Sequence, residues 1–145
     1  MRRPILTLLT ALFVAFTVAT ASAESSVWSA LVMANNRAEP TPIPAELNRV
    51  RGTLKEFFNY NQYEVIGQSR QSLDGEGDWN TTSKYFSLHV GAKPTDKSTY
   101  QLDLQLFQQQ KLLLTTEAKL TKSSPLVIRG PWVGDGQLLL LLLLE

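Results

Sequence analysis

The alternation of apolar and polar residues predicts several strands in the second half of the chain. Period-two alternation begins at Gln62, resumes at Phe86 and is clearest in the two runs 100–106 and 112–120. The apolar positions of these last two runs are Tyr100, Leu102, Leu104, Leu106, Leu112, Leu114, Ala118 and Leu120. Such alternation is typical of antiparallel strands that have one face in the core and one in water.

Two further segments are apolar at nearly every position, which indicates strands buried on both faces. The first is Ser26–Ala34, for which a short helix is the alternative, since periodicity does not settle a run of this length. The second is the run of seven leucines, 138–144, which we interpret as a central strand of a sheet. An exposed run of this kind would aggregate, so either the fold or a partner covers it. If a partner does, Leu138, Leu140, Leu142 and Leu144 are candidates for its docking strand.

A helical period appears once after the first apolar segment, from about Pro44 to Phe58. Its apolar positions, at offsets of three and four, are Leu47, Val50, Leu54, Phe57 and Phe58. Proline suits the first turn of a helix, where its missing N–H has no partner to lose. The order of elements therefore predicts an α+β fold, with one amphipathic helix packed on a mainly antiparallel sheet of about six or seven strands. A β-sandwich with an added helix is the alternative.

The first 23 residues have the three parts of a secretory signal peptide. A basic start at Arg2 and Arg3 precedes an apolar run, which closes on the small residues Ala21-Ser22-Ala23. The apolar run is shorter than the roughly 20 residues that a membrane-spanning helix needs. We therefore expect cleavage after Ala23, export to the periplasm or the medium, no integral membrane segment in the product, and a single domain over 24–145.

Composition narrows the chemistry of that domain. The chain has no cysteine, which excludes disulfides, thiolate metal sites and attachment of a lipid at the cleavage point. The formal charge of +1 falls to −1 when Arg2 and Arg3 leave with the signal peptide, so no electrostatic footprint for nucleic acid remains. No motif indicates a cofactor.

The segments LKEFFNYNQYEVI (54–66) and PLVIRGPWVGDGQLLLLL (125–142), joined by paired strands, carry a resemblance. In this pattern a helix leads to an aromatic-flanked strand, and a Gly-Pro loop leads into an apolar terminal strand. It resembles small, uncharacterised exported proteins of the bacterial envelope. The resemblance implies the architecture above and an envelope location, and it implies no catalytic residue.

Three sets of residues are candidates for a site, and each has a structural alternative. Asp74, Glu76 and Asp78 alternate with glycines, as calcium ligands do, but the twelfth position of such a loop is Tyr85, so a solvated turn is the alternative. Trp79 and Trp132 fall in predicted loops, where they could stack on sugar rings, anchor a protein partner or cap the ends of the sheet.

His89, the single histidine, is predicted to face outward, away from Phe86, Leu88 and Val90. A catalytic role for it would need a pocket that joins it to a carboxylate. We expect a non-catalytic exported protein that binds or assembles with another envelope protein. A glycan-binding module that uses Trp79 and Trp132 is the alternative, and a small hydrolase is the third possibility.

Overall fold

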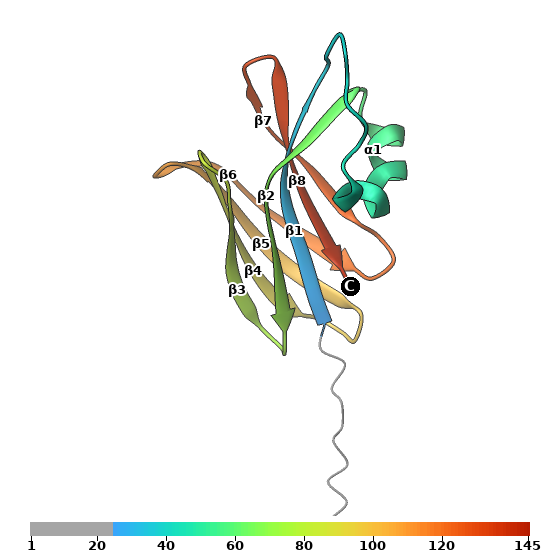
Figure 1. Ribbon diagram of the computed structural model, residues 1–145. Coiled ribbons are helices and arrows are strands. Elements are labelled where there is room, and N and C mark those ends of the chain that lie inside the picture. Colours follow the sequence, from blue (N-terminus) through green and yellow to red (C-terminus); the bar gives the residue numbers. More distant parts are fainter. Residues whose placement is uncertain (1–24) are drawn as a thin grey trace, which may run out of the picture.

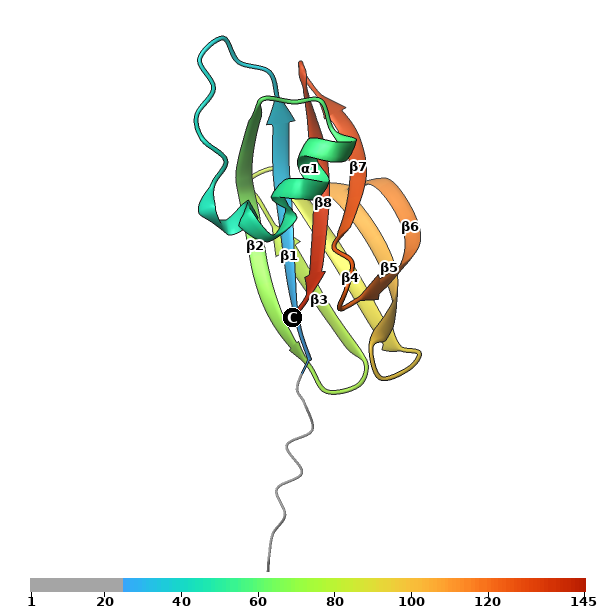
Figure 2. The same ribbon diagram turned by 90° about the vertical axis from the view of Figure 1, so that its right-hand side faces the viewer.

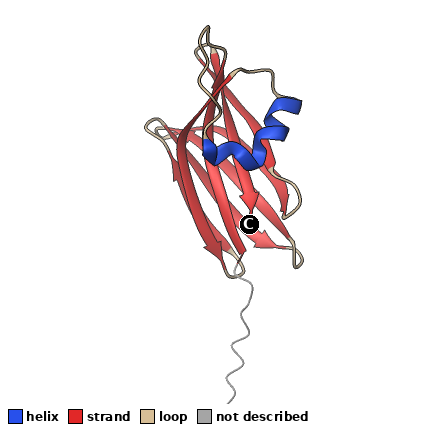
Figure 3. Cartoon of the chain, turned by 45° about the vertical axis from the view of Figure 1, so that its right-hand side comes forward, coloured by secondary structure: helices blue, strands red, loops and turns tan. Residues whose placement is uncertain are grey.

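The computed structural model describes residues 25–145, so the predicted signal peptide, residues 1–23, lies outside the described part of the chain. The elements are, in chain order, β1 (Ser25–Asn35), η1 (Ala45–Val50), α1 (Arg51–Phe57), β2 (Gln62–Leu73), β3 (Gly77–Thr82), β4 (Phe86–Pro94), β5 (Thr99–Gln108), β6 (Lys111–Thr121), β7 (Leu126–Val133) and β8 (Gly136–Leu144). Strands dominate, and the short helical segment packs on one side of them (Figure 3). Within residues 25–145, no helix has the length and apolar character needed to cross a bilayer.

The eight strands form two four-stranded antiparallel sheets that pack face to face (Figure 1). Sheet A has the strand order β2-β1-β8-β7, and sheet B has the order β3-β4-β5-β6. The predicted α+β fold with one helix on a single sheet is therefore wrong, and the arrangement is sandwich-like. Alternation marks which side chains are buried but not what covers them, so it could not show that the turn after β2 moves the chain into a second sheet.

The first core lies between the two sheets. Sheet A contributes the even-numbered leucines of β8, and sheet B contributes the apolar positions of β4 and β5. The alternation predicted for 100–106 is confirmed, since Tyr100, Leu102, Leu104 and Leu106 are all buried. The indole N–H of Trp79, in β3, donates a 3.1 Å hydrogen bond to Ser29 Oγ, in β1, so one buried polar contact also joins the sheets.

A second core lies on the outer face of sheet A, under the helical segment (Figure 2). It contains the odd-numbered leucines 139, 141 and 143 of β8 together with Leu47, Val50 and Leu54 of the helical segment. Both β1 and β8 are therefore covered on both faces, which explains why they are apolar at nearly every position. The prediction that residues 138–144 form a central buried strand is confirmed, because β8 pairs with β1 on one side and β7 on the other.

The predicted helix is present, but it begins as a 3-10 helix and becomes an α-helix only at Arg51. Four of its five predicted apolar positions are buried, whereas the side chain of Phe57 is 62% exposed. Phe58 ends the segment, and the guanidinium of Arg129 lies 4.4 Å from the centre of its ring. Phe57, the last residue of α1, thus lies in solvent, while the backbone becomes extended at Phe58 and that side chain is buried.

The predicted Gly-Pro loop that contains Trp132 is wrong. Strand β7 continues to Val133 through an irregularity between Arg129 and Trp132, and only Gly134 and Asp135 form the turn. Gly134 has a φ of 61°, a conformation that glycine adopts without strain. Pro131 is tolerated because β7 is an edge strand and the proline lies at the irregularity, where a ladder hydrogen bond is already missing.

Candidate functional site

The outer face of sheet B carries a hollow of about 640 Å³. It is lined by Glu76, Gly77, Asp78, His89, Gly91, Ala92, Lys93, Asp103, Leu104, Gln105, Thr115 and Glu117. Four of these residues are acidic and one is a lysine. The helical segment packs on the side of sheet A that faces away from sheet B, so it leaves the outer face of sheet B uncovered (Figure 1).

The strand register places three of the four acidic residues in one row across the sheet. Asp78 of β3 pairs with Gly91 of β4, Gly91 with Asp103 of β5, and Asp103 with Glu117 of β6. Glycine at the second place leaves a notch in the row. A Cβ atom at Gly91 would lie 3.5 Å from Asp78 Oδ1 and 3.9 Å from Asp103 Cβ.

The next row supplies polar side chains without formal charge. It consists of Asn80, His89, Gln105 and Thr115, in the order of the strands. His89 faces outward as predicted and bridges the two rows, with Nε2 2.9 Å from Asp78 Oδ1 and Nδ1 3.0 Å from Asn80 Oδ1. Both ring nitrogens are therefore engaged by neighbouring side chains, and neither is left free to exchange a proton with a substrate.

The three predicted calcium ligands do not converge. Asp74 and Glu76 lie in the turn between β2 and β3, whereas Asp78 lies in β3 and contacts His89. Glu76 and Asp78 line the hollow, and Asp74 does not. Among residues 25–145, no three histidine or carboxylate side chains are arranged to hold a metal ion.

The two predicted tryptophans lie in strands rather than loops, and they do not share a surface. Trp79 is buried in the core between the sheets, at 7% exposure, while Trp132 of β7 is 67% exposed. Trp79 therefore has no face to offer to a ligand. The leucines proposed as a docking strand lie in β8, whose two edges are both paired within sheet A.

A second cavity, of about 400 Å³, opens between the sheets at the end where the β3–β4, β5–β6 and β7–β8 turns lie (Figure 1). It is lined by Phe86, Gln108, Leu113, Pro131, Trp132, Val133 and Gly134. Next to its lining residues are two more exposed apolar side chains, those of Tyr85 and Leu112. No pattern of residues predicts this cavity, because it depends on how far the two sheets overlap.

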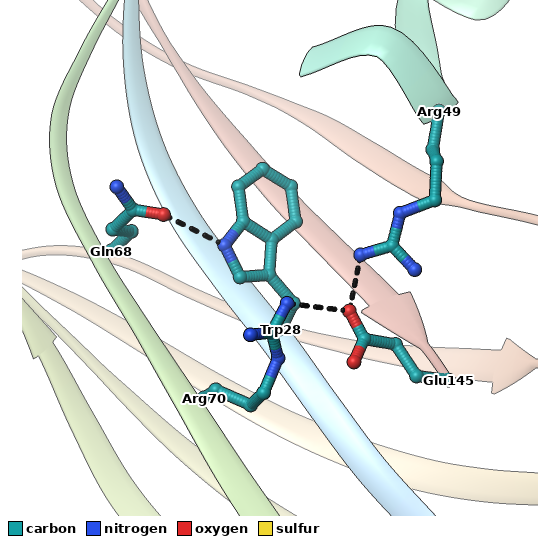
Figure 4. A network of polar contacts seen from close by, with 5 residues as sticks. All are labelled: Trp28, Arg49, Gln68, Arg70 and Glu145. Atoms are coloured by element: carbon teal, nitrogen blue, oxygen red, sulfur yellow. Dashed lines mark hydrogen bonds and ion pairs between the residues drawn. The ribbon is translucent and has the colours of Figure 1, made fainter. Parts of the chain in front are cut away.

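A polar cluster on the other side of the molecule holds the end of β8 in place (Figure 4). The carboxylate of Glu145 forms ion pairs with Arg49 of η1 and with Arg70 of β2, the latter at 2.9 Å. The hydrogen bond from Arg49, reinforced by that from Arg70, holds the pKa of Glu145 below its ordinary value against the opposing effect of burial. Beside them, the indole N–H of Trp28 donates to Gln68 Oε1 at 3.0 Å. The two ion pairs of Glu145 thus join η1 and β2 to the end of β8. The side chains of this cluster bond to one another.

Asp78 and His89 are separate candidates from the sequence, whereas Asp103 and Glu117 are not. Both occupy the outward positions of their strands, so their exposure could be predicted. That they lie opposite each other could not be predicted, because this depends on the register between β5 and β6, which shifts near Leu106. The hollow is therefore the best candidate site, and its central residues emerge only from the three-dimensional structure.

Comparison with known proteins adds no relative: no protein-family model, no curated protein and no solved structure matches this chain.

Proposed function

We propose that this chain is an exported, non-catalytic binding protein of the bacterial envelope, and that it binds a basic, extended segment of another envelope protein in the hollow on sheet B. The apolar leader of the sequence supports the export. The resemblance of segments 54–66 and 125–142 to envelope proteins supports the location. The observation that carries the binding proposal is the pair Asp103 and Glu117, two carboxylates placed directly opposite each other on adjacent strands.

Two like charges at directly opposed positions destabilise a sheet. Within residues 25–145, neither Asp103 nor Glu117 forms an ion pair, and the one lysine that lines the hollow, Lys93, forms none either. The fold therefore keeps a local excess of negative charge that its own side chains do not neutralise. Lysine or arginine side chains of a partner would supply the missing positive charge and relieve the repulsion.

The polar row beside the acidic row suits a peptide backbone. The amide of Gln105 and the hydroxyl of Thr115 are able to donate and accept hydrogen bonds, and neither forms a hydrogen bond to another described side chain. Gly91 carries no side chain, so nothing of its own stands between Asp78 and Asp103 in the acidic row. The hollow's volume lies within the range of about 300–1,000 Å³ typical of ligand sites.

Calorimetric titration of residues 24–145 with a peptide of alternating lysine and threonine tests the proposal. We expect binding that weakens with added salt and that falls at least about fivefold in the double variant Asp103→Asn, Glu117→Gln. Glu39→Gln, which removes an exposed acid from the connector before η1, is the matched control and should bind as the wild type does. Equal binding by the wild type and the double variant would contradict the proposal, as would a preference for a neutral oligosaccharide.

A small hydrolase is a second candidate, because two carboxylates from adjacent strands line the same hollow. The directly opposed acids Asp103 and Glu117 would then be the pair that such chemistry requires. Hydrolysis of chromogenic glycosides that disappears in Asp103→Asn would favour this function over binding alone. Activity that persists in Asp103→Asn would exclude these acids as its source.

A further inference from the structure

The open end of the sandwich, defined by the β3–β4, β5–β6 and β7–β8 turns, has a surface unlike the rest of the molecule. Three of the four large apolar side chains that the described chain exposes lie there: Tyr85 at 55%, Leu112 at 48% and Trp132 at 67%. Each lines the 400 Å³ cavity or adjoins a residue that lines it. They come from three different turns or strand ends at this end of the sandwich.

Two lysines accompany these apolar side chains. Lys84 immediately precedes Tyr85 and Lys111 immediately precedes Leu112, and both lysines are exposed. Lys84 Nζ lies 5.4 Å from the centre of the Tyr85 ring. The backbone N–H of Gln109 bonds to the carbonyl of Tyr85, which keeps the two sheet B turns together. Asp135 of the β7–β8 turn is acidic, so the three turns and their neighbouring lysines retain a positive excess.

We propose that this end docks on an anionic lipid surface. Tryptophan and tyrosine prefer the boundary between headgroups and acyl chains, because their rings are apolar and their N–H and O–H groups are polar. Lysine side chains reach from that depth to the phosphates, and each adds attraction to an anionic leaflet. A protein partner would also be served by exposed apolar side chains, but the lysines beside two of the three make the charge complementary to a lipid surface. This proposal does not depend on the function of the hollow.

The tryptophans provide a direct test. Trp28 and Trp79 are buried, at 4% and 7% exposure, so a change in emission on binding reports Trp132. Residues 24–145, which include every described element, avoid the apolar leader that would bind vesicles by itself. Adding vesicles of phosphatidylcholine and phosphatidylglycerol in equal parts should shift the emission to shorter wavelength and protect it from acrylamide. Vesicles of phosphatidylcholine alone should produce a much smaller effect.

Variants separate the contributions to docking, with co-sedimentation as the measurement. Trp132→Ser combined with Tyr85→Ser should lower the partition onto the mixed vesicles by about tenfold or more. Lys84→Gln with Lys111→Gln should lower it several-fold and remove its dependence on phosphatidylglycerol. The matched control is Phe57→Ser, which removes an equally exposed aromatic ring from α1 and should leave the partition unchanged.

Three results would overturn the proposal. The first is the absence of any emission shift or co-sedimentation with the mixed vesicles. The second is binding that the double variant of Trp132 and Tyr85 leaves unchanged. The third is concentration-dependent dimerisation in sedimentation velocity that the same double variant abolishes, which would assign this end to a second copy of the chain.

Discussion

Sheets A and B have the same number of strands and the same antiparallel pairing, but they differ in what covers them. Sheet A lies between the helical segment and sheet B, and its central strands β1 and β8 are apolar at nearly every position. Sheet B has one face in the core and one in solvent, and its strands β4 and β5 alternate. The helical segment covers the central strands of sheet A, so the candidate site of the molecule lies on the uncovered face of sheet B.

The difference between the two sheets predicts the largest change in the free energy of unfolding for substitutions in β8, whose two faces belong to different cores. Leu140 packs between the sheets, and Leu141 packs under the helical segment. Replacing either with alanine should lower the free energy of unfolding by about 2–5 kcal/mol, measured by urea denaturation, because each change leaves a cavity in a closed core. On the open face of sheet B, Lys119→Ala should change it by no more than about 0.5 kcal/mol.

A small effect of Leu141→Ala on the free energy of unfolding, similar to that of Lys119→Ala, would contradict this difference between the two sheets. It would mean that the helical segment contributes little to stability and that sheet A is covered on one face only. Because Leu140 and Leu141 are adjacent in the chain and both are fully buried, the pair tests the two cores under matched conditions.

Two glycines test where the sheets come into close contact. A Cβ atom at Gly67 of β2 would lie 2.2 Å from the carbonyl oxygen of Thr82 in β3, so the edges of the two sheets meet there backbone to backbone. Gly67→Ala should therefore cost about 1–3 kcal/mol of unfolding free energy. Gly52 in α1 has nothing within 4 Å of the same position, and Gly52→Ala should stabilise the protein by about 0.5–1 kcal/mol.

If this interpretation is correct, thermal denaturation should show a lower Tm for Gly67→Ala and a higher Tm for Gly52→Ala than for the wild type. A neutral Gly67→Ala would mean that β2 and β3 separate at little cost, and the two sheets would then be less tightly joined than Figure 1 suggests.

The elements were largely predictable from the sequence, whereas their assembly was not. The strand Ser26–Ala34, the helical segment near 44–58 and the leucine strand all follow from local patterns, since burial on one or two faces is recorded in the spacing of apolar residues. The division into two sheets was missed, because the turn at Asp74–Glu76 looks the same whether the next strand joins the same sheet or another. The sequence predicts a loop at Trp79 for a related reason. The residues on either side of it in β3 are polar and face solvent, so the short strand resembles a polar turn.

The candidate site was half predictable. Outward positions identify Asp78, His89, Asp103 and Glu117 as exposed, and nothing more. Their convergence depends on register, which for β5 and β6 includes a shift, and on the glycine between Asp78 and Asp103. Residue spacing within one strand does not show chemistry that is shared among four strands, so the sequence indicates the acids of the turn and not those of the sheet.

The smallest expected effect lies at the edge of the covered face of sheet A, where Glu145 links β8 to Arg49 and Arg70. Hydrogen bonds from these arginines lower the pKa of Glu145 below its ordinary 4.5, so the carboxylate favours the folded state when it is charged. That stabilisation is complete above about pH 4.5 and disappears as the pH falls through the lowered pKa of the folded state. Glu145→Gln should therefore cost about 0.2–1 kcal/mol of unfolding free energy at neutral pH, since both arginines are more than half exposed. Urea denaturation from pH 7 to pH 3 should show the wild type losing this advantage in acid, and a gap between the two proteins that stays constant over the range would show that the cluster does not support sheet A through its charge.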